Sequence, residues 1–580
     1  VLGADVALTG SAFSFTTGTT IDGGQALSFS GGAVVVDGSI GETTPLTLVT
    51  LSADIITPGS FNVGSLALSA NANVTAADIE VGGTVDVGAN NLTLTQTGTA
   101  SSGNVLGIIS GSGNITKAGA GNVLFVAANT YTGVTSVSAG ELWISNSSGL
   151  GDSGAGSGTT VATGAALYLN GSLTVNEVLD LQGSLETGAA PVATWTGPIT
   201  VSGGNSLIEV DSPGDTLVIS GNITGTVGLT VTTDPGGTVV FSGDNAYTGV
   251  TSVSGGNLNF NGTSTGSDFT VTSGSNLRGS GSITGAVTVE SGGGLRPGTS
   301  PGIISTGNLD LQSGSTLTAE IFGYATAGTD YDQLDVTGTV TLGGALSLVG
   351  VPAAATGGET VTLINNDGTD AVVGTFSNAP TNGGIVSFNG QDWRILYDGG
   401  DGNDVVLVFG NADLSIDDVT LAEGNSGDTV FTFTVTVDQA VGGAFAVDFV
   451  VNDDTATAAD DFSPVPAGTL NFTGLTSGET KTVSVTVSGD TKVELNQVFQ
   501  VVLSNLTGTQ AANVSIGKST GVGTITNDDA AVLTVGDVSV AEGNAGTATL
   551  SFTVSLDNPV DTDVTVTLDT ADGTATVADN

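Results

Sequence analysis

Two short sequences recur far apart in this 580-residue chain, and they constrain its fold more than any other feature. The segment Tyr131-Thr-Gly-Val-Thr-Ser-Val-Ser138 returns unchanged at 247–254, and the segment Ala422-Glu-Gly-Asn425 returns at 541–544. Repeated units bury their apolar faces against neighbouring units, so two kinds of repeat predict extended arrays and not one compact enzyme fold. This organisation favours roles in structure, adhesion and display.

Residues 1–410 alternate apolar and polar side chains over short stretches that end at Gly, Asn or Asp. Examples are Leu66–Leu68, Leu92–Thr95 and Leu309–Leu311. A period of two with β-branched residues indicates strands that bury one face. Because a sandwich needs longer strands, many short ones favour a parallel β-helix, a solenoid of stacked coils with about 20 residues per coil.

The charge balance excludes several classes of function. The net charge is −49, because only seven Lys and Arg accompany 56 Asp and Glu. So few cations cannot neutralise a run of phosphates or bind anionic lipid, and we expect no nucleic-acid partner. The chain has no Cys and no His, which removes disulfides, thiolate metal sites and the usual general base. It also has no apolar run of the length that spans a membrane, so we expect no membrane insertion within it.

The first repeat resembles a known family. Asn114-Ile-Thr-Lys117 followed by 129–142, with a second copy at 245–258, resembles the autotransporter-associated β-strand repeat of bacterial passenger domains. Segments 295–302 and 330–338 resemble the sequence that usually follows these repeats. The resemblance implies a right-handed β-helix on a cell surface over residues 1–410, without implying a particular activity.

Three features of this region have alternative interpretations. Tyr131 and Tyr247 would either stack on carbohydrate or pack in turns with hydrogen-bonded hydroxyls, and packing is favoured. Segment 399–405 fits one calcium-binding nonapeptide of β-rolls, but a single copy favours a turn between strands 393–397 and 405–409 that closes the solenoid. A glycan-cleaving β-helix would need carboxylates clustered with Arg or Lys, so an enzyme is the least favoured interpretation.

Strands become longer after residue 410. Thr429–Val437, Phe445–Val451 and Thr482–Val487 alternate cleanly, which indicates an immunoglobulin-like sandwich. A second sandwich begins at residue 531 and is incomplete at 580, so we expect the natural chain to continue or another subunit to supply the missing strands. The pattern over 411–530 resembles the Calx-β domain, and the segments that carry this resemblance are 422–425, 453–462, 489–494, 499–505 and 523–529.

The Calx-β resemblance implies a Ca2+ site at one end of the sandwich. Oxygen ligands from several loops suit Ca2+, and so many carboxylates without a cation would cost several kcal/mol in repulsion. Gln497, Gly489 and Asn527 stand where relatives can have acids, which would weaken the affinity or remove one ion. The alternative is that the acids are solvated loop residues. The implied ligands are Glu423, Asp453, Asp490, Glu494, Asp528 and Asp529, with Glu542 and Asp572 as counterparts in the second copy.

Taken together, these features predict a secreted, extracellular, non-enzymatic structural protein of all-β class. We expect a β-helical stalk followed by calcium-binding sandwiches, which self-associates or binds surface and matrix components in a cell-surface layer, filament or matrix. The alternative is a monomeric adhesin stalk for cell–cell or surface adhesion, with glycans among its candidate partners. An aromatic content of only 5% argues against a strong ligand platform in this chain.

Overall fold

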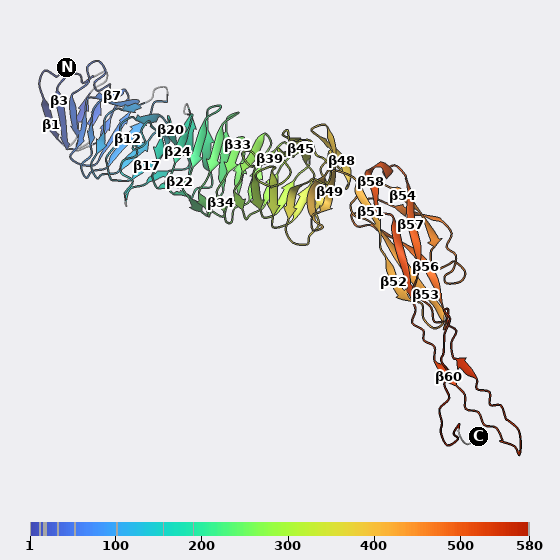
Figure 1. Cartoon of the computed structure of the whole chain (residues 1–580). Coiled ribbons are helices and arrows are strands. Elements are labelled where there is room, and N and C mark those ends of the chain that lie inside the picture. The colour runs from blue at the N-terminus through green and yellow to red at the C-terminus, as the bar shows by residue number, and fades with distance from the viewer. Residues whose placement is uncertain are drawn as a thin grey trace. The chain divides into compact units, whose positions relative to one another are not determined.

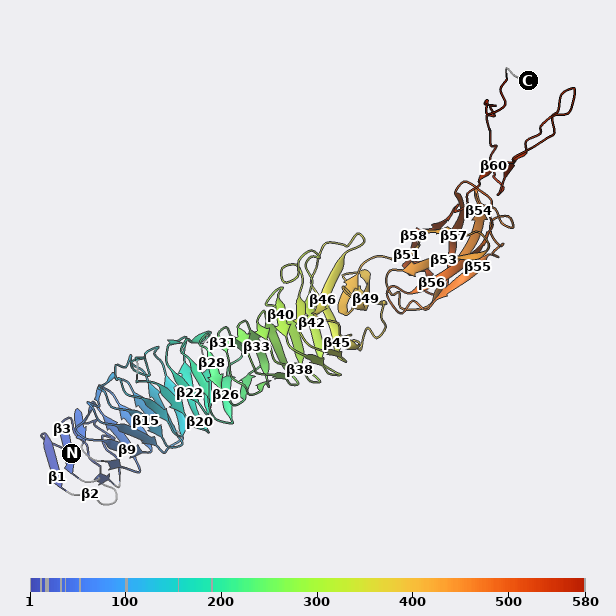
Figure 2. The same cartoon turned by 90° about the horizontal axis from the view of Figure 1, so that it is seen from below.

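The computed structural model describes residues 2–10, 13–15, 20–31, 34–36, 38–51, 54–99, 103–154, 156–188 and 191–577. The chain divides into two compact units, residues 1–380 with 386–409, and residues 381–385 with 410–580 (Figures 1 and 2). In the described ranges all regular structure is strand, apart from one 3-10 turn at Ala511–Asn513. The predicted all-β class is therefore confirmed. These ranges also contain no helix long and apolar enough to cross a membrane.

The first unit is a parallel β-solenoid, as predicted. Asp78 pairs with Ser60, 18 residues earlier, and Gly140 pairs with Ala165, 25 residues later. Beyond residue 311 the coils lengthen, since Leu309 pairs with Val340. One continuous sheet contains fifteen strands, one from each successive coil from residue 60 onward, coloured from blue to yellow in Figure 1. They are β7 (Ser60–Val63), β10 (Asp78–Val81), β13 (Gly103–Val105), β16 (Asn122–Phe125), β18 (Gly140–Ile144), β20 (Ala165–Asn170), β23 (Ser184–Gly188), β26 (Ser206–Val210), β29 (Leu229–Thr233), β32 (Thr251–Val253), β35 (Phe269–Val271), β38 (Val287–Val289), β41 (Leu309–Leu311), β44 (Val340–Leu342) and β47 (Val373–Gly374).

Four further sheets form the other faces of the solenoid, and alternation decides which side chains enter its core. In β12 (Leu92–Gln96) the first, third and fifth side chains are buried and the two Thr side chains between them are only partly buried. In-register pairing then stacks apolar residues of successive coils and removes them from water. This burial stabilises the fold by about 25 cal/mol per Å² of apolar surface. One such buried row contains Val123, Leu142, Leu167, Leu185, Ile208, Val231, Val253, Val271, Val289, Leu311 and Leu342.

The two tyrosine repeats pack inside the solenoid. Tyr131 is fully buried and its hydroxyl lies 2.6 Å from Thr135 Oγ1, while Tyr247 is buried with its hydroxyl against Thr251 Oγ1. The packing interpretation is therefore confirmed. The copies do not lie on the same face, however. β17 (Thr135–Val137) belongs to an eleven-stranded sheet, whereas its counterpart β32 belongs to the fifteen-stranded sheet, so the second copy is displaced by one face.

The last coils end in antiparallel pairing. β46 (Thr360–Asn366) pairs with β50 (Asp404–Val408), and β50 pairs with β49 (Gln391–Gly399). Segment 399–405 is therefore the turn of this hairpin, as favoured above. Asp404 Oδ1 accepts a hydrogen bond from the backbone N–H of Asn366 at 2.9 Å, which connects the turn to the preceding coil.

The second unit contains a two-sheet sandwich. Phe499 lies at the centre of its core, with ring centroids 5.6 Å from Phe431, 5.8 Å from Phe433 and 4.9 Å from Phe462. The three predicted long strands all lie within observed ones. The four-stranded sheet contains β56 (Thr480–Gly489), β53 (Gly427–Val437), β51 (Ala412–Ile416) and β58 (Val514–Lys518), and the five-stranded sheet contains β52 (Val419–Ala422), β59 (Thr520–Thr526), β57 (Gln497–Thr507), β54 (Phe445–Asp453) and β55 (Gly468–Phe472).

Residues 531–577 form one short antiparallel pair, β60 (Leu533–Val535) with β61 (Val554–Leu556). Large apolar side chains such as Phe552 and Leu568 are exposed, at 58% and 68%. The segment contacts the sandwich loop before β57, where the N–H of Val493 donates to Pro559 O at 2.9 Å. This contact brings the second copy against the acidic end of the first.

Candidate metal centre

Strand register brings the predicted acidic loops to one end of the sandwich. β52 pairs in parallel with β59, with Ala422 opposite Thr526, so Glu423 and residues 527–529 leave the sheet at the same edge. β53 pairs with β56, with Gly427 opposite Gly489, which places the loop before β53 next to Asp490. Three loops that are distant in sequence therefore meet at this end.

Three carboxylates form the centre of this arrangement. One oxygen from each of Glu423, Asp528 and Asp529 lies within 4.8 Å of the others. Glu423 and Asp529 are buried, at 6% and 7% exposure, whereas Asp528 is exposed. Gly424 N donates to Asp528 Oδ1 at 3.2 Å, and Asn425 Nδ2 donates to Asp529 Oδ1 at 2.6 Å. The loop before β53 thus orients both aspartates.

Asp529 Oδ2 shows what this group lacks. It is buried and has no hydrogen-bond partner among the described residues. A buried carboxylate oxygen without a partner costs free energy, because it has left water without gaining another interaction. Carboxylate oxygens are hard donors, and a hard divalent cation would satisfy this one. The residues present therefore fit a Ca2+ ion.

The electrostatics of Glu423 agree with this interpretation. Burial is the largest cause that raises the pKa of Glu423 from 4.5 to about 7, and the charges of Glu494, Asp490, Asp529 and Asp528 raise it further. The pKa of Asp529 is also raised, by burial first and then by Asp528 and Asp490. Carboxylates this close cannot all ionise freely without a neighbouring cation.

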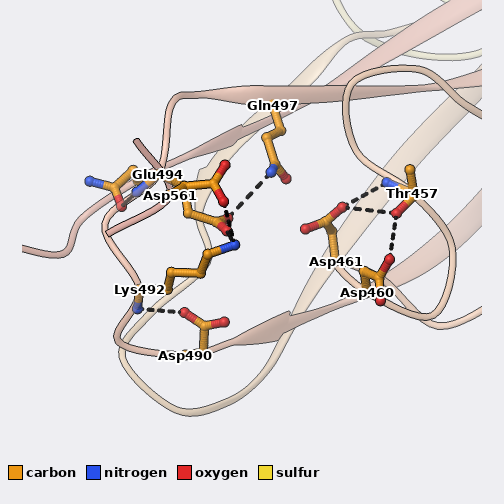
Figure 3. A network of polar contacts seen from close by, with 9 residues as sticks. Thr457, Asp460, Asp461, Asp490, Lys492, Glu494, Gln497 and Asp561 are labelled. Atoms are coloured by element: carbon orange, nitrogen blue, oxygen red, sulfur yellow. Dashed lines mark hydrogen bonds and ion pairs between the residues drawn. The ribbon is translucent and has the colours of Figure 1, made fainter. Parts of the chain in front are cut away.

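Asp490 and Glu494 are close enough for their charges to act on Glu423. Both already have partners of their own, as Figure 3 shows. Glu494 Oε1 forms an ion pair with Lys492 Nζ at 2.6 Å, and Glu494 Oε2 accepts from Gln497 Nε2 at 3.3 Å. Asp490 Oδ1 accepts from the backbone N–H of Lys492 at 2.7 Å. Lys492 Nζ also pairs with Asp561 Oδ1 of the second copy at 2.8 Å. Lys492 therefore partly neutralises this side of the site.

The remaining predicted ligands do not join the group of three among the described residues. Asp453 ends β54 and accepts from the N–H of Ala458 at 3.0 Å, so it organises its own loop. In that loop Asp461 Oδ2 accepts from Thr457 N at 2.7 Å (Figure 3). In the second copy Glu542 is exposed, and Asp572 accepts from Val577 N at 3.0 Å.

Sequence reasoning missed two residues of the site, Asn425 and Lys492. Asn425 is the last residue of the segment repeated at 541–544, and this repetition was a signal for its structural role. Lys492 is one of only seven basic residues and lies between two predicted ligands, which was a signal for a built-in countercharge. Its second partner, Asp561, belongs to the other copy and carries no local signal.

Comparisons with known proteins agree with both parts of the chain. Residues 415–531 and 526–580 match the Calx-beta domain, and residues 115–144 and 236–260 match the passenger-associated-transport-repeat. Over 293 residues the chain is 36% identical to "Adhesin BmaC autotransporter" of Brucella suis biovar 1 (strain 1330). The matched segment covers 47% of this chain and 8% of that protein. The chain thus carries passenger repeats and Calx-beta domains, and it is a secreted, surface-exposed protein.

Solved structures of Calx domains resemble about a fifth of the chain. The crystal structure of the apo-form Calx CBD1 domain is 20% identical and covers 20% of this chain and 99% of that chain, with a TM-score of 0.18. The Calx CBD2 domain is 16% identical and covers 20% of this chain and 86% of that chain, also with a TM-score of 0.18.

Proposed function

We propose that this chain is a non-enzymatic part of a bacterial surface adhesin, with a β-solenoid stalk and a Calx-beta sandwich that binds Ca2+. The unpartnered, buried Asp529 Oδ2 beside Glu423 and Asp528 carries the metal part of this proposal. Ca2+ takes six to eight oxygen ligands from flexible loops, and the three loops that meet here offer carboxylates and backbone carbonyls. Transition metals are disfavoured, because the chain has no His or Cys.

The bound ion has a mechanical role in this proposal. Glu423 follows a strand of the five-stranded sheet, and the loop it starts leads into β53 of the four-stranded sheet. Residues 527–529 follow β59 and lead toward the second copy. An ion held by Glu423, Asp528 and Asp529 would therefore stiffen both the end of the sandwich and the start of the following segment.

The solenoid supplies length in this proposal. Fifteen stacked strands at about 4.8 Å per strand extend over about 70 Å. The relative named as an adhesin supports the adhesin interpretation for this chain. Self-association into a layer, filament or matrix is the competing arrangement, with the same stalk and the same ion.

Calorimetric titration of Ca2+ into the metal-free chain tests the site. We expect binding in the range of about 10⁻⁶ to 10⁻³ M, and Asp529→Asn should weaken it by at least about tenfold. Asp537→Asn is the matched control, because it removes one negative charge at an exposed position of the second copy. Equal affinities for the wild type and Asp529→Asn would exclude this group as the site.

Electron microscopy in Ca2+ and then in chelator separates the two arrangements. Isolated particles in both conditions support the adhesin, whereas ordered sheets or filaments that dissolve in chelator support a calcium-dependent assembly. A release of reducing ends from a panel of surface polysaccharides would contradict the non-enzymatic part of the proposal.

A further inference from the structure

A cavity of about 240 Å³ on the solenoid contains two of the three arginines of this highly acidic chain. Four consecutive strands of one sheet form its floor, β33 (Gly256–Phe260), β36 (Ser275–Gly279), β39 (Gly294–Pro297) and β42 (Thr316–Glu320). Asn259 pairs with Arg278, and Arg278 pairs with Arg296, so these side chains form one row across adjacent coils. Glu320 and Asp332 also line the cavity.

We propose that Arg278 and Arg296 bind an oxyanion carried on a hydroxylated ligand, of the class of a uronic-acid residue of a glycan. Two planar guanidinium groups side by side match the two oxygens of a carboxylate, because each can donate a pair of parallel hydrogen bonds. This site lies in the solenoid and does not depend on the calcium site of the sandwich.

The register of the two arginines is unfavourable without such a ligand. Residues opposite each other in adjacent parallel strands lie about 4.8 Å apart, and like charges in this position destabilise a sheet. The pKa of Arg278 is lowered by burial first and by Arg296 second, although Glu320 opposes the shift. An anion between the two guanidinium groups would turn this repulsion into attraction.

Several polar atoms around the cavity lack hydrogen-bond partners among the described residues. Neither guanidinium group forms a hydrogen bond or an ion pair with a described residue, and Arg278 Nε is buried without a partner. Lys117 shows the contrast, since its fully buried ammonium group donates to three backbone carbonyls at 2.9–3.0 Å. The arginine donors are therefore available to a ligand.

The same cavity also has acceptors without donors. Glu320 Oε2 and Asn259 Oδ1 are buried and find no partner in the described part of the chain. The Asp332 carboxylate, in contrast, already accepts from the N–H groups of Gly302 and Glu320, both at 2.8 Å. A bare inorganic oxyanion would satisfy the arginines and leave these two oxygens unsatisfied. A sugar acid brings hydroxyl donors as well as the carboxylate, so it satisfies both kinds of group.

Calorimetric titration of the full chain at low ionic strength, with glucuronate, inorganic sulfate and glucose as probes, tests this proposal. We expect glucuronate to bind at least about tenfold more tightly than glucose, because hydrogen bonds to charged groups are among the strongest available here. If sulfate displaces glucuronate but binds more weakly than glucuronate does, the result supports a pocket that binds an oxyanion and also recognises hydroxyl groups. Sulfate that binds more tightly than glucuronate would overturn the assignment to a sugar acid.

Arg296→Gln is the decisive variant, because Arg296 is exposed and its removal should leave the core intact. It should weaken glucuronate binding by about tenfold or more, and Arg296→Lys should restore only part of the loss because lysine lacks the planar fork. Lys518→Gln, which removes an exposed cation of the sandwich, is the matched control and should leave binding unchanged. Equal losses in Arg296→Gln and Lys518→Gln, or no binding of glucuronate up to about 100 mM, would overturn the proposal.

Discussion

Replacing Glu423 by Gln should stabilise the metal-free sandwich and weaken its binding of Ca2+. The folded-state pKa of Glu423 is raised from 4.5 to about 7, so without a metal ion the folded site favours the neutral carboxyl group. Its contribution to the free energy of unfolding is therefore fully present below about pH 4.5 and is lost as the pH rises to about 7. Glutamine is neutral at every pH and avoids this loss.

The expected magnitude follows from the two pKa values. Each pH unit between them is worth about 1.4 kcal/mol, so the variant should gain up to about 3 kcal/mol over the wild type at pH 8 in chelator. The difference should vanish near pH 4.5. With saturating Ca2+ at pH 8 the order should reverse, because the wild type then gains binding free energy that the variant lacks.

Hydrogen–deuterium exchange with mass spectrometry resolves this effect within the full chain, since it reports on β52 and β59 separately from the solenoid. A gain of about 3 kcal/mol slows exchange through global opening of the sandwich by about two orders of magnitude. Glu542→Gln is the control, because it changes the same position of the repeated segment where the side chain is exposed. If Glu423→Gln exchanges as fast as the wild type in chelator at pH 8, burial and carboxylate repulsion do not govern this site.

Three further predictions concern the ion and the solenoid. Ca2+ binding at pH 6.5 should release close to one proton, because Glu423 is then largely protonated. Calorimetry in two buffers of different ionisation enthalpy should detect this release at pH 6.5 and find none at pH 9. Tyr131→Phe should lower the free energy of unfolding in a denaturant titration by about 1 kcal/mol, because it leaves Thr135 Oγ1 without its buried partner. Tyr168→Phe, on the outer surface of the solenoid, should lower it by less. Gly140→Ala should destabilise the solenoid by at least about 2 kcal/mol, since φ is 63° and the new Cβ would clash with the carbonyl oxygens of Gly119 and Gly121. Gly164→Ala should cost only about 1 kcal/mol, because its φ of 78° is also positive but its Cβ would meet no atom. Equal losses in the two glycine variants would contradict the predicted clash.

The sequence was sufficient for the local structure of the solenoid and insufficient for its long-range register. Alternation predicted strands such as Leu66–Leu68 and Leu309–Leu311 with their observed bounds, because side chains of a strand alternate between its two faces. The pairing of Arg278 with Arg296 depends on the length of the coil between them, which varies along the chain and has no local signal. The arginine cavity therefore became visible only in the structure.

The candidate metal centre shows the same division between local and long-range information. Motif resemblance identified Glu423, Asp528 and Asp529, which the sheet register brings together. The same resemblance also suggested Asp453, but the structure shows that its carboxylate caps the N–H of Ala458 in its own loop. A motif gives the residue types near a site, whereas the register of the strands decides which carboxylates lie together.

The displacement of the second tyrosine repeat by one face has a consequence for how such chains diversify. Both copies bury their tyrosine equally well, so the faces of the solenoid are interchangeable for this sequence. An insertion or deletion of the residues that make one face of a coil would leave the core intact. It would rotate every later row of side chains about the long axis of the solenoid. Recombination between related genes could thus redirect a surface feature, such as the arginine row, toward a different azimuth without altering the residues that build it.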